Sequence, residues 1–413
     1  MLLNDEDIIT QRADYTFKHN KNLGRHGWLR LTPAYSVKLV NRLLEKADSH
    51  IFILDPFSGT ATTGLAAAER GNNAITFDIN PFLVWFGNAK CQNYSEANLA
   101  VLNSKILDLL KTVEKTLSHD NWTPPLFNIE RWWSKHTLQI LATLRTALVE
   151  SIGEPKENEN TVENLAWVAF CRLIIETSSA AFNHVSMSFS TEVSHYDVVH
   201  VLSLYKEIFD YVMSSCTKKI RGSSKVLHID ARFIPEMDMK FDLVITSPPY
   251  PNRMSYIREL RPYMYWTKFI GEAREAGEMD WKAIGGTWGI ATSRLNDWMP
   301  EEEKLPKLLY ETVNNISKSE SKNGKLLANY VLKYFHDMHL HFASLRRVLS
   351  DKAELHYIVG NSTFFGIMVD TAEILAISMK DLGYEDVNYE IIRKRNCNKA
   401  LFEYDVSAKW TRK

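Results

Sequence analysis

The pentapeptide Thr246-Ser247-Pro248-Pro249-Tyr250 gathers residues that could do chemistry at the end of the apolar run 241–245. Two consecutive prolines make the backbone rigid and remove two N–H donors. The carbonyl groups and the Ser247 hydroxyl can then face outward together as hydrogen-bond acceptors, beside the ring of Tyr250. Acceptors next to a stacking ring suit a planar base that carries an exocyclic amino group. The alternative interpretation is a turn at the end of a strand, with the tyrosine in the core.

A loop of small residues follows the apolar run 51–54 and reads Asp55-Pro56-Phe57-Ser58-Gly59-Thr60-Ala61-Thr62-Thr63-Gly64. Gly59 lets the backbone approach a ligand closely, and the helix expected after the loop offers free N–H groups. The loop lacks the Gly-Lys-Ser/Thr of a phosphate-binding loop and the three spaced glycines of a dinucleotide site. Taken alone, it predicts either a ligand-binding loop of another kind or a structural turn.

Asp78 ends the next apolar run, 74–77, and lies 23 residues after Asp55. An acid at the end of the second strand can accept hydrogen bonds from both ribose hydroxyls of an adenosine ligand. For Asp78 alone, a helix cap is the alternative interpretation. The loop and the acid together favour a cofactor that contains a nucleoside.

The elements that position these residues alternate between strands and helices. A strand at 51–54, a short helix and a strand at 74–77 form a βαβ unit, which begins a parallel, doubly wound sheet. A helix over 34–47 is expected to be capped by Thr32, with Pro33 in its first turn. Further strands are expected at 225–230, 241–245, 354–362 and 386–396, and further helices at 327–350 and 371–384.

The chain divides into five expected parts. Apolar residues recur at helical spacing between the two halves of the sheet, which predicts a helical insertion there. The parts are 1–91 (N-terminal element and cofactor half), 92–221 (helical insertion), 222–250 (catalytic strands and pentapeptide), 251–329 (variable region) and 330–413 (end of the catalytic domain).

The composition excludes several classes of protein. Among 413 residues, 49 Lys and Arg stand against 50 Asp and Glu, which excludes a histone-like polycation but not one basic face that binds nucleic acid. The four cysteines show neither a CxxC pair nor zinc-ligand spacing, so we expect a reduced cytosolic protein without a structural metal. The acidic start of the chain predicts no signal peptide, and no apolar run is long enough to span a membrane.

The motifs resemble those of S-adenosylmethionine-dependent DNA amino-methyltransferases. Asp55-Pro56-Phe57-Ser58-Gly59, Asp78-Ile79-Asn80-Pro81 and the pentapeptide are similar to the family's cofactor, ribose and catalytic motifs. Ser-Pro-Pro-Tyr is most typical of the cytosine-N4 enzymes, whereas adenine-N6 enzymes more often carry Asp or Asn in place of the serine. The segment 24–34 is similar to the element that holds the methionine end of the cofactor, and Asp230 matches the acid near the adenine amino group. The resemblance covers roughly 1–91, 222–256 and 330–413.

The resemblance implies a Rossmann-like class I methyltransferase sheet with helices on both faces, and a set of site residues. The implied catalytic residues are Ser247, Pro248, Pro249 and Tyr250. The implied residues for S-adenosylmethionine are His26, Thr32, Asp55, Pro56, Phe57, Ser58, Gly59, Thr60, Asp78, Ile79, Asp230 and Ala231. Ala61 departs from the family, because many relatives carry a second glycine there.

The predicted function is N4 methylation of a flipped cytosine in double-stranded DNA. The resemblance implies the cytoplasm of a bacterium or archaeon and a restriction-modification system with a partner endonuclease. Adenine-N6 methylation, RNA methylation and a non-enzymatic binding module remain the alternatives. Cytosine C5 methylation is excluded, since no cysteine follows a proline as its nucleophile requires. Arg253, Arg258 and Arg261, directly after the pentapeptide, are expected either to contact DNA phosphates or to form a solvated surface.

Overall fold

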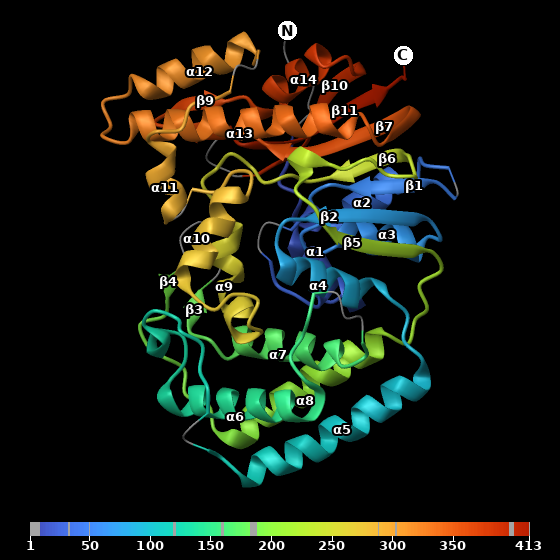
Figure 1. The fold of residues 1–413 in the computed structure, drawn as a ribbon, viewed down its shortest axis with the longest axis vertical. Coiled ribbons are helices and arrows are strands. Elements are labelled where there is room, and N and C mark those ends of the chain that lie inside the picture. Colours follow the sequence, from blue (N-terminus) through green and yellow to red (C-terminus); the bar gives the residue numbers. More distant parts are fainter. Residues whose placement is uncertain are drawn as a thin grey trace.

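The computed structural model describes residues 9–31, 34–48, 50–118, 121–157, 161–181, 188–287, 289–301, 304–395 and 400–412. Its centre is a seven-stranded sheet with the strand order β10-β11-β7-β6-β1-β2-β5 (Figure 1). These strands are β1 (Phe52–Asp55), β2 (Asn73–Asp78), β5 (Ser223–His228), β6 (Phe241–Thr246), β7 (Leu349–Gly360), β10 (Glu385–Lys394) and β11 (Phe402–Trp410). Neighbouring strands from β5 to β7 are parallel, and β11 is antiparallel to both β7 and β10. This mixed, largely parallel sheet confirms the predicted Rossmann-like architecture.

Helices and short strands complete the fold. The helices are α1 (Phe17–Asn20), α2 (Val37–Leu44), α3 (Thr62–Glu69), α4 (Pro81–Cys91), α5 (Glu96–Lys115), α6 (Lys135–Ile152), α7 (Asn164–Glu176), α8 (Val198–Ser215), α9 (Tyr256–Trp266), α10 (Ala273–Lys282), α11 (Ile290–Leu295), α12 (Lys307–Ser317), α13 (Gly324–Leu345) and α14 (Thr371–Asp381). The 3-10 helices are η2 (Ala13–Tyr15), η3 (Gly24–Gly27), η4 (Ile129–Arg131) and η5 (Ala231–Phe233). Two small antiparallel pairs join β3 (Ala180–Ala181) to β4 (Ser188–Phe189) and β8 (Ser362–Phe364) to β9 (Ile367–Val369).

Helices cover both faces of the sheet because its central strands are apolar on both sides. Successive residues of a strand point to opposite faces, so β1 supplies one buried residue to each. Ile53 packs in a cluster with α2 and α3, and Leu54 packs in a cluster with α13 and α14. Both side chains are fully buried. Near-continuous apolar runs of this kind are typical of parallel strands buried on both faces.

Helix α4 joins the sheet to a layer formed by α5, α6, α7 and α8, which lies at the bottom of Figure 1. Asn80 begins this helix, since its side-chain oxygen accepts a hydrogen bond from the Phe82 N–H at 3.0 Å and Pro81 occupies the first turn. Every residue of α4 after Pro81 is buried. The helix therefore has no face left for solvent, and it fixes the helical layer against the sheet.

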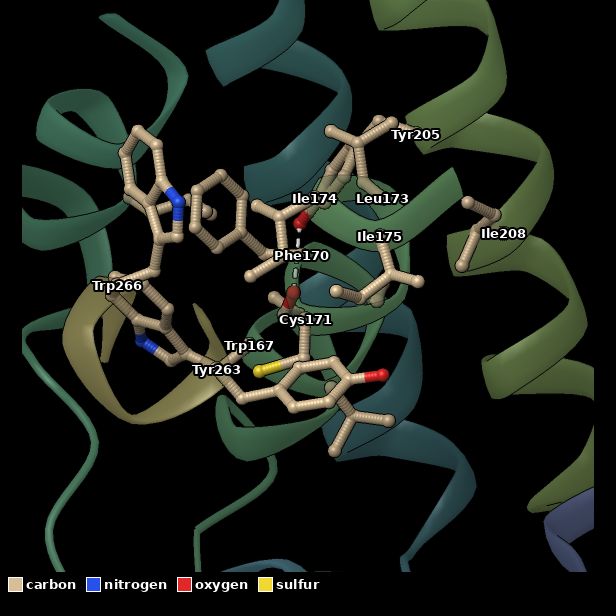
Figure 2. Close-up of a cluster of buried hydrophobic side chains, with 14 of the residues drawn as sticks. Trp167, Phe170, Cys171, Leu173, Ile174, Ile175, Tyr205, Ile208, Tyr263 and Trp266 are labelled. Atoms are coloured by element: carbon tan, nitrogen blue, oxygen red, sulfur yellow. Dashed lines mark hydrogen bonds between the residues drawn. The ribbon is translucent and has the colours of Figure 1, made fainter. Parts of the chain in front are cut away.

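Helix α9, which follows the pentapeptide, is anchored in the helical layer. Figure 2 shows Tyr263 and Trp266 of α9 among Trp167 and Phe170 of α7, in the cluster that also holds the buried Cys171. The Phe170 and Trp266 rings meet edge to face, with their centroids 5.6 Å apart. The chain leaving the pentapeptide is thus held by aromatic packing.

Two local expectations are wrong or incomplete. Helix α2 begins at Val37, and its cap is Ser36, whose hydroxyl accepts a hydrogen bond from the Lys38 N–H at 3.1 Å. The cap is therefore not Thr32, which lies outside the described residues together with Pro33. Strand β11 was not predicted from the sequence, because the acids Glu403 and Asp405 interrupt its apolar pattern even though both are buried.

Candidate active site

A cleft with about 960 Å³ of empty space opens at the carboxyl ends of β1, β2 and β6. Open α/β sheets bind ligands at this edge. The residues that line the cleft are Leu31, Ala34, Tyr35, Pro56, Phe57, Ser58, Gly59, Thr60, Thr62, Phe77, Asp78, Ile79, Asn80, Leu83, Ile229, Asp230, Ala231, Ser247, Pro249, Tyr256, Ile257, Leu260, Lys282, Ala283 and Ile284.

The loop after β1 is tied to β2 and turns sharply at two positions. The Ser58 N–H donates to the Phe77 carbonyl at 2.8 Å. Gly59 has φ +51° and Ala61 has φ +55°, both in the left-handed region. For alanine this conformation costs roughly 1–2 kcal/mol. The loop therefore keeps two left-handed positions although residue 61 is an alanine and not a glycine.

Asp78 joins the loop to the second strand through its carboxylate. One carboxylate oxygen accepts from the Gly59 N–H at 2.9 Å, and the other accepts from the Asn80 N–H at 2.9 Å. Each oxygen keeps a further lone pair for a ligand. Burial raises the pKa of Asp78 to about 7, although the hydrogen bonds from the two N–H groups act in the opposite direction and lower it. A carboxylate with spare acceptor sites therefore faces the cleft and titrates near neutral pH.

Asp55 lies beneath the cleft and does not line it. Its Oδ1 accepts from the Phe57 N–H at 3.0 Å and from the Thr246 hydroxyl at 2.5 Å. Its Oδ2 has no partner among the described residues, and burial raises its pKa to about 6. Asp55 therefore connects the loop after β1 with the start of the pentapeptide.

Ser247 and Tyr250 are oriented by the neighbouring strands β7 and β11. The Ser247 hydroxyl donates to the Ile358 carbonyl of β7 at 3.0 Å, so its oxygen can act only as an acceptor toward a ligand. The Tyr250 hydroxyl donates to Glu403 of β11 at 2.8 Å. Ser247 and Pro249 line the cleft, whereas Pro248 and Tyr250 are not part of its lining.

Asp230 and Ala231 line the end of the cleft after β5, and hydrogen bonds from Arg232 and His341 hold them in place. Arg232 donates to the Asp230 carboxylate at 2.6 Å and to Asp337 of α13 at 3.2 Å. The His341 ring donates from Nδ1 to the Ala231 carbonyl at 2.8 Å. Burial lowers the pKa of His341 to about 4, so the ring is neutral and positions the backbone. This end of the cleft is rigid.

Nine of the predicted cofactor residues lie together in the lining, and two others among the described residues, His26 and Asp55, do not. Those in the lining are Pro56, Phe57, Ser58, Gly59, Thr60, Asp78, Ile79, Asp230 and Ala231. The structure does not bring His26 to the cleft: its ring is buried with Nε2 3.3 Å from Glu69 of α3, and burial lowers its pKa to about 4. Asp55 lies beneath the cleft, and Thr32 lies outside the described residues.

The three predicted DNA-binding arginines lie on or next to α9. Arg253 is exposed and has φ +62°, and its N–H donates to the Tyr330 hydroxyl at 3.1 Å. Arg258 and Arg261 are half-buried on α9, and burial lowers the pKa of Arg261. Their contact with DNA stays a prediction.

The sequence did not identify the apolar wall of the cleft. Tyr256, Ile257 and Leu260 of α9 line it, as do Ala283 and Ile284 after α10. These residues lie in the part of the chain predicted as a variable region, and no pattern marks them. The nearness of Tyr256 to the pentapeptide is the one available signal.

Comparisons with known proteins find methyltransferases. A family model described as D12 class N6 adenine-specific DNA methyltransferase matches residues 37–140. Type II methyltransferase M.BsoBI from Geobacillus stearothermophilus is 22% identical over 439 residues, covering 95% of this chain and 85% of that protein. Type II methyltransferase M.AvaI, from Nostoc sp. and from Anabaena variabilis, is 23% identical over 414 residues, covering 90% of this chain and 82% of that protein. Among solved structures, the rRNA methyltransferase aviRa from Streptomyces viridochromogenes matches with a TM-score of 0.28 and 10% identity over 92% of this chain and 87% of that one.

The similarity to type II methyltransferases and the matched family model support a DNA methyltransferase. The likeness to type II methyltransferases extends over nearly the whole chain. The matched family model contains the loop after β1 and Asp78, and it favours adenine N6 over the predicted cytosine N4. Its match ends before Ser247.

The described residues contain neither a cluster of metal ligands nor a membrane-spanning helix. Within these residues, no three His, Cys, Asp or Glu side chains gather in a way that could hold a metal ion. No helix in the described part of the chain combines the length and apolarity needed to cross a membrane.

Proposed function

We propose that this protein is a DNA amino-methyltransferase that uses S-adenosylmethionine to methylate the exocyclic amino group of a flipped base. The observation that carries the proposal is that Asp78, at the end of β2, and Ser247, after β6, line one cleft. Asp78 can accept hydrogen bonds from the ribose hydroxyls of the cofactor, and Ser247 can accept one from the amino group of the base. The two ligands would therefore meet in the same cleft. The type II methyltransferases similar to this chain support the same activity.

The lining of the cleft fits an adenosine-containing cofactor. The Asp78 carboxylate has lone pairs for the two ribose hydroxyls, and Ile79 and Ile229 offer apolar surface to a purine ring. Asp230 offers an acceptor for the adenine amino group. When bound, S-adenosylmethionine supplies a methyl group already activated by the sulfonium.

The residues of the pentapeptide prepare the nitrogen that accepts the methyl group. The lone pair of an exocyclic amino group is delocalised into its ring, so the nitrogen is nearly planar. Ser247 already donates its proton to Ile358, and its oxygen can accept one N–H of the base while the Pro248 carbonyl accepts the other. These bonds favour a tetrahedral nitrogen with its lone pair aimed at the methyl group. Positioning supplies the catalysis, and after the methyl group is transferred the positively charged nitrogen would release one proton to water.

We propose cytosine N4 as the target. Ser247 is a short neutral acceptor where adenine-N6 enzymes more often carry Asp or Asn. The residue at this position would approach the reacting nitrogen, whereas the matched family model covers residues 37–140 and ends before Ser247.

Adenine N6 is the second candidate, and the family model is the observation that favours it. The same residues would act on either base, because both present an exocyclic amino group on a flat ring.

Nucleoside analysis separates the two candidates. The purified protein is incubated with unmethylated plasmid DNA and S-adenosylmethionine deuterated in its methyl group, and the digested DNA is analysed by mass spectrometry. We expect the label in N4-methylcytosine. Label in N6-methyladenine would establish the second candidate, and an unlabelled digest would contradict both. Plasmid incubated without protein is the control.

The DNA-binding surface follows from the same proposal. Base flipping requires the double-stranded DNA to lie across the mouth of the cleft. We assign phosphate contacts to Arg253, Arg258 and Arg261, and target recognition to the region 251–329 with part of the helical insertion 92–221. A partner endonuclease in a restriction-modification system would cut the same sequence.

A further inference from the structure

The Tyr250 hydroxyl is bonded to a carboxylate buried inside the sheet. Glu403 lies on β11, between β7 and β10, and is paired in register with Gly360 of β7 and Arg393 of β10. Its side chain is 4% exposed. A buried carboxylate is costly unless it is paired and hydrogen-bonded, so its partners are informative.

Arg393 and Tyr250 are the partners of Glu403. Arg393 donates from Nε to Oε2 at 2.6 Å and from Nη2 to Oε1 at 3.0 Å. Tyr250 donates to Oε1 at 2.8 Å. Arg393 compensates the charge, and the tyrosine of the pentapeptide makes a charge-assisted bond with the same carboxylate.

The Tyr250 ring is also enclosed by neighbours. The guanidinium carbon of Arg395 lies 5.0 Å from the ring centroid, and Arg395 Nη1 donates to the Asn361 carbonyl at 2.9 Å. Gly360 makes room for both groups, because a Cβ there would lie 2.9 Å from Tyr250 Cδ2 and 2.3 Å from Arg395 Nη1. A cation over an aromatic ring occupies one of its two faces. A base that stacks on Tyr250 would therefore take the opposite face.

We infer that Glu403 is a positioning residue, which fixes the Tyr250 ring as the platform on which the flipped base stacks. This inference rests on the proposed function. Tyr250 lies in a loop, so its ring can swing about the Cα–Cβ bond unless its hydroxyl end is held. The bond to Glu403 holds that end, and Arg393 holds Glu403, while Gly360 and Arg395 pack against the ring itself. The base then meets a ring whose position is already fixed, and less rotational freedom is lost on binding.

A double-mutant cycle tests the inference. Tyr250→Phe, Glu403→Gln and the double variant are compared with the unaltered protein by transfer of labelled methyl groups to plasmid DNA. Tyr250→Phe should lower kcat/KM for DNA about tenfold, and about threefold in the Glu403→Gln background, because hydrogen bonds to charged acceptors are stronger than neutral ones. KM for S-adenosylmethionine should stay within twofold throughout.

Asp405→Asn is the matched control. Asp405 is a buried acid on the same strand, and it bonds His356 at 2.8 Å instead of Tyr250. Its variant should keep kcat/KM for DNA within twofold of the unaltered protein. An equal loss in this control would mean that any disturbed β11 carboxylate lowers the rate, and the positioning role would be wrong.

The remaining outcomes also decide the matter. An unchanged kcat/KM in Tyr250→Phe would overturn the inference. This variant leaves the Glu403–Arg393 pair intact, so it still tests the inference if Glu403→Gln fails to fold. Losses that multiply independently in the double variant would show that Glu403 acts elsewhere. If the unaltered protein transfers no label to DNA, both the proposed function and this inference are wrong. If it transfers label and the cycle shows no coupling between Tyr250 and Glu403, only the inference is wrong.

Discussion

Replacing Asp78 by asparagine tests how the cleft binds its cofactor. The substitution keeps the shape of the side chain but removes the charge that the ribose hydroxyls would meet. The Asp78 carboxylate already accepts from the Gly59 and Asn80 N–H groups, so an asparagine must turn one N–H₂ toward a donor. Two ribose bonds to a charged acceptor, each weakened by about 1 kcal/mol in the variant, lower affinity by about 2 kcal/mol, or roughly thirtyfold in Kd.

The pKa of Asp78 makes this difference depend on pH. Burial raises that pKa to about 7, and the ligand prefers the ionised form. The ionised fraction therefore falls about tenfold between pH 8 and pH 6, and Kd for S-adenosylmethionine should rise about tenfold over the same range. The asparagine variant has no such titration, so its disadvantage should shrink to roughly threefold at pH 6.

The unliganded protein should show the opposite dependence in its stability. A carboxyl whose pKa is raised on folding contributes stability that is present below its ordinary value of 3.8 and is lost as the pH rises through about 7. Calorimetric titrations at pH 6, 7 and 8 measure the affinities, and denaturant unfolding over the same range measures the stability. A Kd ratio between the two proteins that stays constant with pH would refute the assignment of Asp78 to the ribose.

Three further variants have defined outcomes. Gly360→Ala should lower kcat/KM for DNA at least tenfold, because the new Cβ displaces the Tyr250 ring, while Kd for S-adenosylmethionine stays unchanged. An unaffected kcat/KM would show that the position of the Tyr250 ring does not matter. Arg258→Ala with Arg261→Ala should weaken DNA binding and reduce its salt dependence; altered unfolding without altered DNA affinity would make these arginines structural. Ala61→Gly should change the free energy of unfolding by less than about 1 kcal/mol, since relief of the left-handed φ offsets the lost methyl group; a loss well above this in urea unfolding would contradict the strain.

The parallel half of the sheet could be predicted because its strands are nearly continuous apolar runs. The end of each run marks the edge at which ligands bind, so Asp55, Asp78 and Ser247 could be placed near one another before the structure was known. Asp55 nevertheless lies beneath the cleft, because its carboxylate bonds Phe57 and Thr246 rather than facing outward.

The antiparallel part of the sheet could not be predicted from local pattern. The buried acids of β11 resemble a solvent-exposed strand or loop until their partners are known. Glu403 is tolerated inside the sheet only because β10 brings Arg393 beside it. His26 was predicted to bind the cofactor because the segment 24–34 resembles a cofactor-binding element. Its ring is instead buried against Glu69, away from the cleft. Both outcomes depend on contacts between segments far apart in the chain.

Methyl transfer by the Ser247→Ala variant is the most direct test of the central claim. The unaltered protein and the variant are each saturated with labelled S-adenosylmethionine and mixed with the same plasmid DNA, and the initial rate of label incorporation is measured. We predict that the unaltered protein labels DNA and that the variant does so at least a hundredfold more slowly, with cofactor affinity unchanged by calorimetry, because the Ser247 bond matters as the nitrogen becomes tetrahedral. Equal rates in the two proteins would contradict the claim that this cleft performs the transfer.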